Sequence, residues 1–274
     1  MAGLVCVLTL VGMSSARASV TIGQLPETTP TPSCPITPTD YLQPSVTSGE
    51  LYIAREAGTI VSWSTRASID PGQEFVPKVF RRTADPDVFQ VVEHSPQVTL
   101  VAGLLNTFPV SLPVRSGDML GFNAGGAVSA CTSDVPGDRV LTRLGDLADG
   151  QPGTFAPKAD SRLNLSAVLV PSNDFTVTVK PDHQGKAAVT VFTSNPGVVS
   201  LSGKGLRSGR AAKSVFVAGP VHFQVTAAGR SSRRLARRGR VSIRATVTFA
   251  PTSGEPRSQQ ITVRLRKRRT LGVL

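Results

Sequence analysis

The stretch Arg240–Ala250, RVSIRATVTFA, decides the fold class. Every second position in it is apolar: Val241, Ile243, Ala245, Val247 and Phe249. The positions between them hold Ser, Arg or Thr. Because successive side chains of a strand point to opposite faces, this alternation predicts a β-strand with one buried and one solvated face.

Similar short runs continue on both sides of this strand. Residues 173–266 also contain Phe175–Lys180, Lys186–Phe192, Val198–Ser202, Lys213–Ala218, Val221–Ala227 and Gln260–Leu265. Seven strands within about a hundred residues are typical of a small immunoglobulin-like sandwich. We therefore predict such a β-sandwich over 173–266, followed by a basic tail over 267–274.

The residues before position 172 also contain short apolar or alternating runs that are separated by turn residues. Strand candidates are Thr59–Ser64, Phe75–Arg82, Val88–His94, Thr99–Leu104, Thr107–Val114, Met119–Asn123, Ala127–Thr132 and Arg162–Val170. Val140–Ala148, with leucines every three residues and an interrupting Gly145, is expected to be a loop with one helical turn. Short strands at this spacing predict a jelly-roll-like β-sandwich over 49–171, so the fold class is all-β with two sandwich domains.

The N-terminal residues predict export. Leu4–Met13 is apolar but too short to span a bilayer, and Ala16 and Ala18 form an A-x-A cleavage pattern. We expect residues 1–18 to be a signal peptide, the alternative being a buried N-terminal strand or helix. Residues 19–48 are rich in Pro and Thr and are expected to form an extended, exposed leader. We expect no transmembrane segment in the mature chain.

The cysteines are consistent with an oxidising compartment. Cys6 lies in the predicted signal peptide, which leaves Cys34 and Cys131 in the mature chain. An even cysteine count in an exported chain favours a Cys34–Cys131 disulfide, and two separate thiols are the alternative. Two cysteines and three scattered histidines lack the spacing of a metal site, so we expect neither metal nor cofactor.

The two parts of the chain have opposite net charges. Residues 1–170 have a net charge of −4, and residues 171–274 have a net charge of +16. The candidate polyanion-binding residues are Arg230, Arg233, Arg234, Arg237, Arg238, Arg240, Arg266, Lys267, Arg268 and Arg269. Their basicity fits a solvated surface, or attachment to an anionic cell-wall polymer, acidic polysaccharide or lipid headgroups. Nucleic acid is disfavoured, because residues 171–274 contain no Trp or Tyr for stacking.

Residues for catalysis are scarce. His94, His183 and His222 are isolated, and no nucleophile elbow, metalloprotease motif or phosphate-binding loop occurs. The loop carboxylates Asp134, Asp138, Asp146, Asp149 and Asp160 are expected to be solvated turn residues rather than calcium ligands. Of the aromatic residues suited to sugar stacking, Trp63 is expected in the core, Tyr52 is a candidate for exposure, and Tyr41 belongs to the leader.

Two resemblances follow from these segments. Val198–Lys204, Ala218–Val221, Ser232–Pro251 and Ile261–Leu265 resemble the bacterial immunoglobulin-like domains that end many secreted actinobacterial proteins. Gly58–Ser64, Val79–Arg81, Arg115–Gly117, Asp118–Gly121 and Cys131 resemble uncharacterised jelly-roll-type modules of similar proteins. The resemblance implies a structural or spacer role and no activity. We therefore expect an extracellular or cell-surface structural or binding protein that is not an enzyme. The alternative is a secreted carbohydrate-binding or carbohydrate-active protein that uses the first sandwich.

Overall fold

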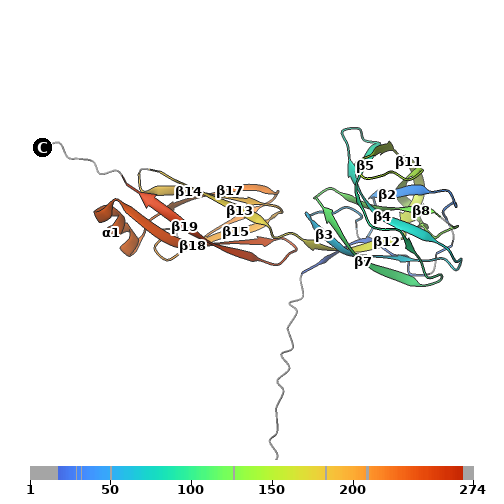
Figure 1. Cartoon of the computed structure of the whole chain (residues 1–274), viewed down its shortest axis with the longest axis horizontal. Helices are drawn as coiled ribbons and strands as arrows, with labels where there is room; N and C mark the ends of the chain where they lie inside the picture. Colours follow the sequence, from blue (N-terminus) through green and yellow to red (C-terminus); the bar gives the residue numbers. More distant parts are fainter. Residues whose placement is uncertain are drawn as a thin grey trace, which may run out of the picture.

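A computed structural model describes residues 18–267, apart from positions 29, 32, 50, 126, 183, 208 and 209. The described residues form nineteen β-strands and one short helix, so the predicted all-β class is confirmed. Figure 1 shows the strands gathered in two bodies that lie end to end. We call β1–β12 the N-terminal half and β13–β19 with α1 the C-terminal half.

The C-terminal half consists of two antiparallel sheets that pack face to face. One has the order β13 (Phe175–Pro181), β14 (Lys186–Thr193), β17 (Gly219–Thr226). The other has the order β16 (Arg210–Val215), β15 (Gly197–Ser202), β18 (Arg240–Pro251), β19 (Arg257–Arg266). The alternating apolar residues of β18 are buried against β14 and β17 in one core, as the alternation predicts.

The N-terminal half also pairs two sheets. The smaller has the order β1 (Val20–Gln24), β12 (Leu165–Pro171), β3 (Gly58–Arg66), β7 (Leu105–Val114). The larger has the order β10 (Pro152–Thr154), β5 (Val88–His94), β4 (Glu74–Arg82), β8 (Met119–Gly125), β2 (Thr39–Ser45), β9 (Thr132–Leu144), β11 (Ala156–Leu163), and β6 (Val98–Thr99) pairs with β4. Trp63 and Phe122 lie in the core between the sheets. A second apolar cluster around Phe80 and Phe155 forms a separate small core.

The expected exposed leader over 19–48 is wrong. β1 pairs with β12, and β2 lies between β8 and β9 in the middle of the larger sheet. Tyr41 and Leu42 of β2 are buried. The prolines do not prevent pairing because Pro44 falls where the register between β2 and β9 shifts, at a place where no regular ladder hydrogen bond is needed.

Three local predictions in the N-terminal half are also wrong. Val140–Ala148 is no helical turn, because its first half continues β9, with Val140 and Leu141 packed in different apolar clusters. The predicted strand Thr99–Leu104 is mainly a turn that follows β6. Ala127–Thr132 forms only an isolated bridge at Ser129 before β9 begins. Some apolar residues of these segments are buried by their neighbours (Leu100, Ala130 and Leu147), whereas others are exposed to solvent (Val101, Leu104 and Leu144).

A buried amide joins the two halves. Asn195, fully buried, accepts the backbone N–H of Ala57 through Oδ1 (2.6 Å). Its Nδ2 donates to the carbonyl oxygens of Ala57 (2.8 Å) and Ser172 (2.7 Å). Asn195, from the C-terminal half, therefore satisfies backbone groups of Ala57 in the N-terminal half and of Ser172 in the segment that joins the halves.

Candidate polyanion-binding surface

Helix α1 (Gly229–Arg238) concentrates arginine at the far end of the C-terminal half (Figure 1). Only Leu235 of this helix is buried, so the arginines face solvent. The helix ends at Gly239, which has φ 66° and donates its N–H to the Leu235 carbonyl (2.8 Å). This helix is not among the elements expected from the sequence, although Arg, Leu and Ala are strong helix formers and glycine commonly follows a helix end.

Gly239 turns the chain directly into β18, which brings further arginines beside the helix. Arg240 lies opposite Arg266 in the register of β18 and β19. The next outward-facing pair is Ser242 and Arg264. Directly opposite side chains have Cβ atoms about 5 Å apart, so Arg240 and Arg266 are close neighbours.

An open groove of ≈ 980 Å³ runs between the helix and these two strands. Its charged lining consists of Arg234, Arg237, Arg238, Arg240, Arg264 and Arg266. An adjoining open groove of ≈ 860 Å³ is lined by Arg230 and Arg233 and shares Arg234 and Arg237 with the first. The two grooves therefore form one continuous basic surface.

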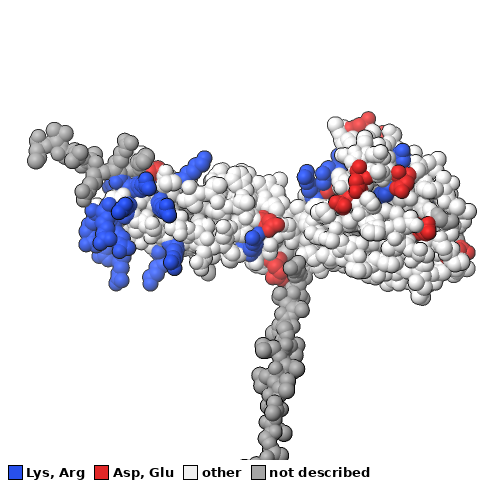
Figure 2. Space-filling view, in the orientation of Figure 1, with Lys and Arg blue, Asp and Glu red and all other residues white. Residues whose placement is uncertain are grey.

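We call this surface the arginine face: Arg230, Arg233, Arg234, Arg237, Arg238, Arg240, Arg264, Arg266 and Lys267. All nine residues are exposed. It unites eight of the ten predicted binding residues and adds Arg264. The other two, Arg268 and Arg269, lie outside the described residues, as does the predicted tail from residue 268 onward. Figure 2 shows the blue side chains gathered at the α1 end, whereas red and blue mix over the N-terminal half.

Carboxylates lie mostly away from the arginine face. Of the three in residues 171–274, Asp174 pairs with Arg257 close to Phe175, and the backbone of Glu255 accepts from Asn173 at the same end. Asp182 already accepts the backbone N–H groups of Gln184 and Lys186. Among described residues, no ion pair involves Arg230, Arg233, Arg234, Arg238, Arg240 or Arg266.

The arginines of α1 repel one another. Arg230 and Arg234, Arg233 and Arg237, and Arg234 and Arg238 are each four residues apart, and such like-charge pairs destabilise a helix by about 0.2–0.5 kcal/mol each. The first turn contains no acidic residue to complement the helix dipole. These repulsions oppose the helix propensity of Arg, Leu and Ala, and only Arg237 and Arg238, in the last turn, complement the helix dipole.

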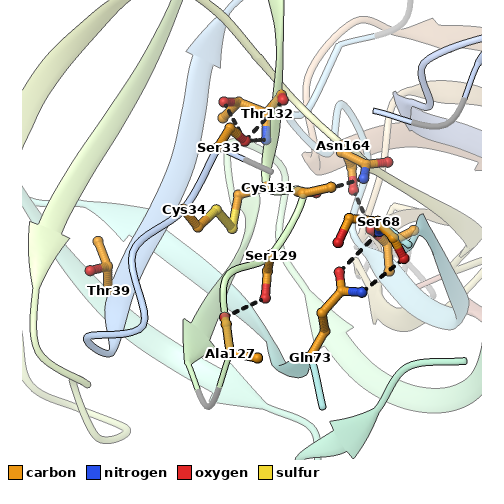
Figure 3. Close-up of a disulfide and its surroundings, with 12 residues drawn as sticks. Ser33, Cys34, Thr39, Ser68, Gln73, Ala127, Ser129, Cys131, Thr132 and Asn164 are labelled. Atoms are coloured by element: carbon orange, nitrogen blue, oxygen red, sulfur yellow. Dashed lines mark hydrogen bonds between the residues drawn. A yellow bond between two sulfur atoms is a disulfide. The ribbon is translucent and has the colours of Figure 1, made fainter. Parts of the chain in front are cut away.

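The predicted cysteine pair lies in the N-terminal half. Cys34 and Cys131 are joined by a disulfide, with Cα atoms 5.7 Å apart (Figure 3). Both are buried, and the backbone N–H groups of Ser33 and Cys34 donate to the Ser129 carbonyl. The bridge therefore holds the segment before β2 against the segment before β9.

The histidines are partnered singly. His94 Nδ1 lies 2.7 Å from Asp149 Oδ1, His222 Nδ1 lies 3.0 Å from Thr190 Oγ1, and both histidines are exposed. His183 lies outside the described residues. Within the described part of the chain, no group of three or more His, Cys, Asp and Glu side chains is placed to hold a metal ion.

One of the loop carboxylates departs from the expectation of solvated turn acids. Asp138 is buried and accepts hydrogen bonds from Arg162 and from the hydroxyl and backbone N–H of Thr47. Burial by itself raises the pKa of Asp138, but these hydrogen bonds outweigh it and hold that pKa below its ordinary value. Asp146 is exposed, as expected, and also contacts the ammonium of Lys78, which bonds the fully buried Asp40. Asp138 and Asp146 therefore both have structural partners.

The aromatic residues considered for sugar stacking are all buried. Trp63 packs against Phe108 with ring centroids 5.1 Å apart, and Tyr41 packs against Phe122. Tyr52 was a candidate for exposure, but that expectation is wrong. Its hydroxyl donates to the Leu163 carbonyl in the core (2.5 Å), and burial raises its pKa. These three rings are therefore not available to a sugar.

Comparisons with known proteins do not assign this chain to a family. No protein-family model matches the chain, and no curated protein shows significant similarity to it. Within the described residues, no helix combines the length and the apolar character needed to cross a bilayer.

Proposed function

We propose that this protein is a secreted or cell-surface binding protein without catalytic activity, and that its arginine face contacts an extracellular polyanion. An anionic cell-wall polymer or acidic polysaccharide is the proposed partner. The observation that carries this proposal is the convergence of α1, β18 and β19 on one basic surface with adjoining open grooves.

The crowding of like charges supports a ligand there. The i, i+4 arginine pairs of α1 and the facing pair Arg240 and Arg266 each cost stability. An anion placed between two such guanidinium groups converts their repulsion into two attractions. Proteins tolerate such local conflicts at functional sites.

The identity of the cations indicates the ligand chemistry. Eight of the nine members of the arginine face are arginine, and the guanidinium fork matches the two oxygens of a carboxylate or phosphate. The grooves are open and continuous, which suits an extended polymer better than a single small anion. Among the described residues, no aromatic side chain lines either groove, which disfavours base stacking with single-stranded nucleic acid.

Export is supported by the A-x-A pattern after Leu4–Met13 and by the Cys34–Cys131 disulfide. The seven strands of the C-terminal half, arranged as three against four, fit the proposed immunoglobulin-like domain. In this proposal the N-terminal half is the jelly-roll-like module, and the C-terminal domain presents the arginine face at its far end.

The test is binding of the chain to immobilised poly(glycerol phosphate) and to polygalacturonate, with uncharged dextran as the control polymer. The variant Arg234→Gln/Arg240→Gln/Arg266→Gln removes three charges of the arginine face. A cation near an anionic surface contributes about 1 kcal/mol, so the loss of three weakens binding by about 3 kcal/mol, or roughly 100-fold. Raising the salt concentration weakens wild-type binding because the charges are exposed.

A matched variant removes the same charge elsewhere. Arg82, Arg115 and Arg139 are exposed residues of the N-terminal half, and Arg82→Gln/Arg115→Gln/Arg139→Gln has the same net charge as the first variant. We expect it to bind nearly as the wild type does. Equal losses in both triple variants, or equal retention on dextran, contradict the proposal. Tighter binding to single-stranded DNA than to either polymer replaces the proposed partner with nucleic acid.

A further inference from the structure

A pocket of ≈ 350 Å³ lies where the N-terminal half meets the turn between β18 and β19. β1 contributes Val20, Thr21 and Ile22, and the segment before β3 contributes Gly49, Leu51, Ile53, Arg55 and Glu56. Leu169 of β12 and Ser253 of the C-terminal half complete the lining. The pocket is therefore bounded by both halves of the molecule.

Glu56 has an incomplete set of partners in this pocket. It is only 6% exposed. Ser253 donates to its carboxyl group from both hydroxyl and backbone N–H. The second carboxylate oxygen, Oε2, is inaccessible to solvent and has no hydrogen-bond partner among the described residues. A buried carboxylate oxygen without a donor is costly, so such an atom indicates a missing donor or cation.

The start of β1 lies beside this carboxylate. Val20 lines the pocket of Glu56, and Ala18 lines a neighbouring pocket together with Ala57. The residue between Ala18 and Val20 is Ser19, so its nitrogen directly precedes a residue that lines the pocket of Glu56. Ser19 is exposed, which leaves the bond before it accessible to a protease.

We propose that the missing partner of Glu56 is the α-ammonium group of Ser19, created when the chain is cleaved after Ala18. This inference rests on the proposed export and cleavage. In that step an external endoprotease uses one water molecule: the hydroxyl group goes to the Ala18 carbonyl carbon, and a proton goes to the Ser19 nitrogen. The new amine takes up a further proton near neutral pH and becomes a cation.

In this proposal, cleavage changes the contacts of Glu56 at the junction of the two halves. Before cleavage the Ser19 nitrogen is an amide with one N–H and no charge. After cleavage it has three N–H donors and a positive charge, which Glu56 accepts while it also holds Ser253. Cleavage therefore connects β1, Glu56 and the β18–β19 turn through one carboxylate.

The charges around the pair set its pH dependence. Arg55 lines the same pocket, and Asp174 and Glu255 line the pocket of Ala18, with Asp174 already paired to Arg257. Burial raises the pKa of Glu56 in the uncleaved chain. The carboxylate raises the pKa of the paired α-amino group above its ordinary value of about 7.7–8.0. The stabilisation is therefore present from the pKa of Glu56 up to about pH 7.7, and it is lost as the pH rises through the raised pKa of the amine or falls through the pKa of Glu56.

The experiment compares three purified chains at pH 7: one that begins at Ser19, the same chain acetylated at its α-amino group, and one that begins at Ala18. We expect the free Ser19 chain to melt about 3–6 °C above the other two, because only it places an ammonium at the correct position. This difference disappears in Glu56→Gln and at a pH well above the raised pKa. Equal melting temperatures for the three chains overturn the proposal.

A second measurement does not depend on the folding of the Glu56 variant. The α-amino pKa of the Ser19 chain, followed by NMR or by its acylation rate against pH, is expected to lie above that of the urea-unfolded chain. An unchanged pKa overturns the pairing. Sequencing the N-terminus of the protein secreted by its host tests cleavage separately. A different natural N-terminus rejects cleavage at Ala18 and with it the maturation step, whatever the three purified chains show about the pocket.

Discussion

Lys78 offers the sharpest test of how the N-terminal half is held together. Its ammonium is buried, with only 2% of the side chain exposed, and it bonds Asp40 (2.8 Å), the Leu147 carbonyl (2.7 Å) and Asp146. Asp40 also accepts from the side chain of Asn123 and from the backbone N–H of Leu147. The change Lys78→Met keeps most of the volume and removes the cation.

The expected loss follows from the charge left behind. Removing one partner of a buried ion pair costs about 3–5 kcal/mol, because the other charge stays buried without compensation. Asp40 retains two hydrogen bonds, which places the loss in the free energy of unfolding at the lower end, about 3 kcal/mol. The double variant Lys78→Met/Asp40→Asn removes both charges and is expected to lose at least about 1 kcal/mol less than the sum of the single variants.

Trp63 makes the assay specific to this half of the chain. It is the only tryptophan, is 1% exposed, and lies in the N-terminal core, so its fluorescence in a urea titration reports unfolding there. Lys204→Met, at an exposed position in the C-terminal half, is the control and should leave the transition unchanged. A Lys78→Met chain within about 1 kcal/mol of the wild type would refute the assignment of a stabilising role to this ion pair.

Three further predictions concern other buried contacts. Asn195→Ala leaves the Ala57 N–H without its acceptor and should weaken the coupling of the two halves by about 1–3 kcal/mol, seen as separation of their unfolding transitions in calorimetry. Cys34→Ala/Cys131→Ala opens a loop with a sequence separation of 97 and should lower the free energy of unfolding by about 2–4 kcal/mol. The wild type under reducing conditions should match it. The lowered pKa of Asp138 means that its stabilisation is present above about pH 3.9 and is lost as the pH falls through that pKa. Asp138→Asn should therefore flatten the acid limb of a pH-stability curve measured by fluorescence, and an unchanged curve would contradict this.

The sequence predicted the strands whose alternation is regular. β18 and β5 lie where the pattern placed them, because one face of each is buried and the other is not. β2 and β9 were missed because they lie inside the larger sheet and carry prolines and polar residues that locally resemble a loop. Their strand conformation depends on neighbours far away in sequence, which no local pattern records.

The sequence also predicted part of the candidate polyanion-binding surface. Clustered arginines predicted a basic surface, but its form depends on two tertiary features. One is the left-handed Gly239, which turns α1 back beside β18. The other is the register that places Arg240 opposite Arg266 and Arg264 next to both. The pocket of Glu56 had no sequence signal, because its lining comes from four separate segments.

By itself the sequence determined the all-β class, the division of charge between the two halves and the cysteines available for a bridge. These properties follow from composition and from a two-residue period that each strand carries alone. Only the tertiary structure decided which strands are central, which cations meet and which carboxylate lacks a donor. Those outcomes depend on side chains that are distant in the chain but share one interior. A buried charge or polar atom without a partner there lowers the stability of the folded state, so the pairing of such groups depends on the whole fold.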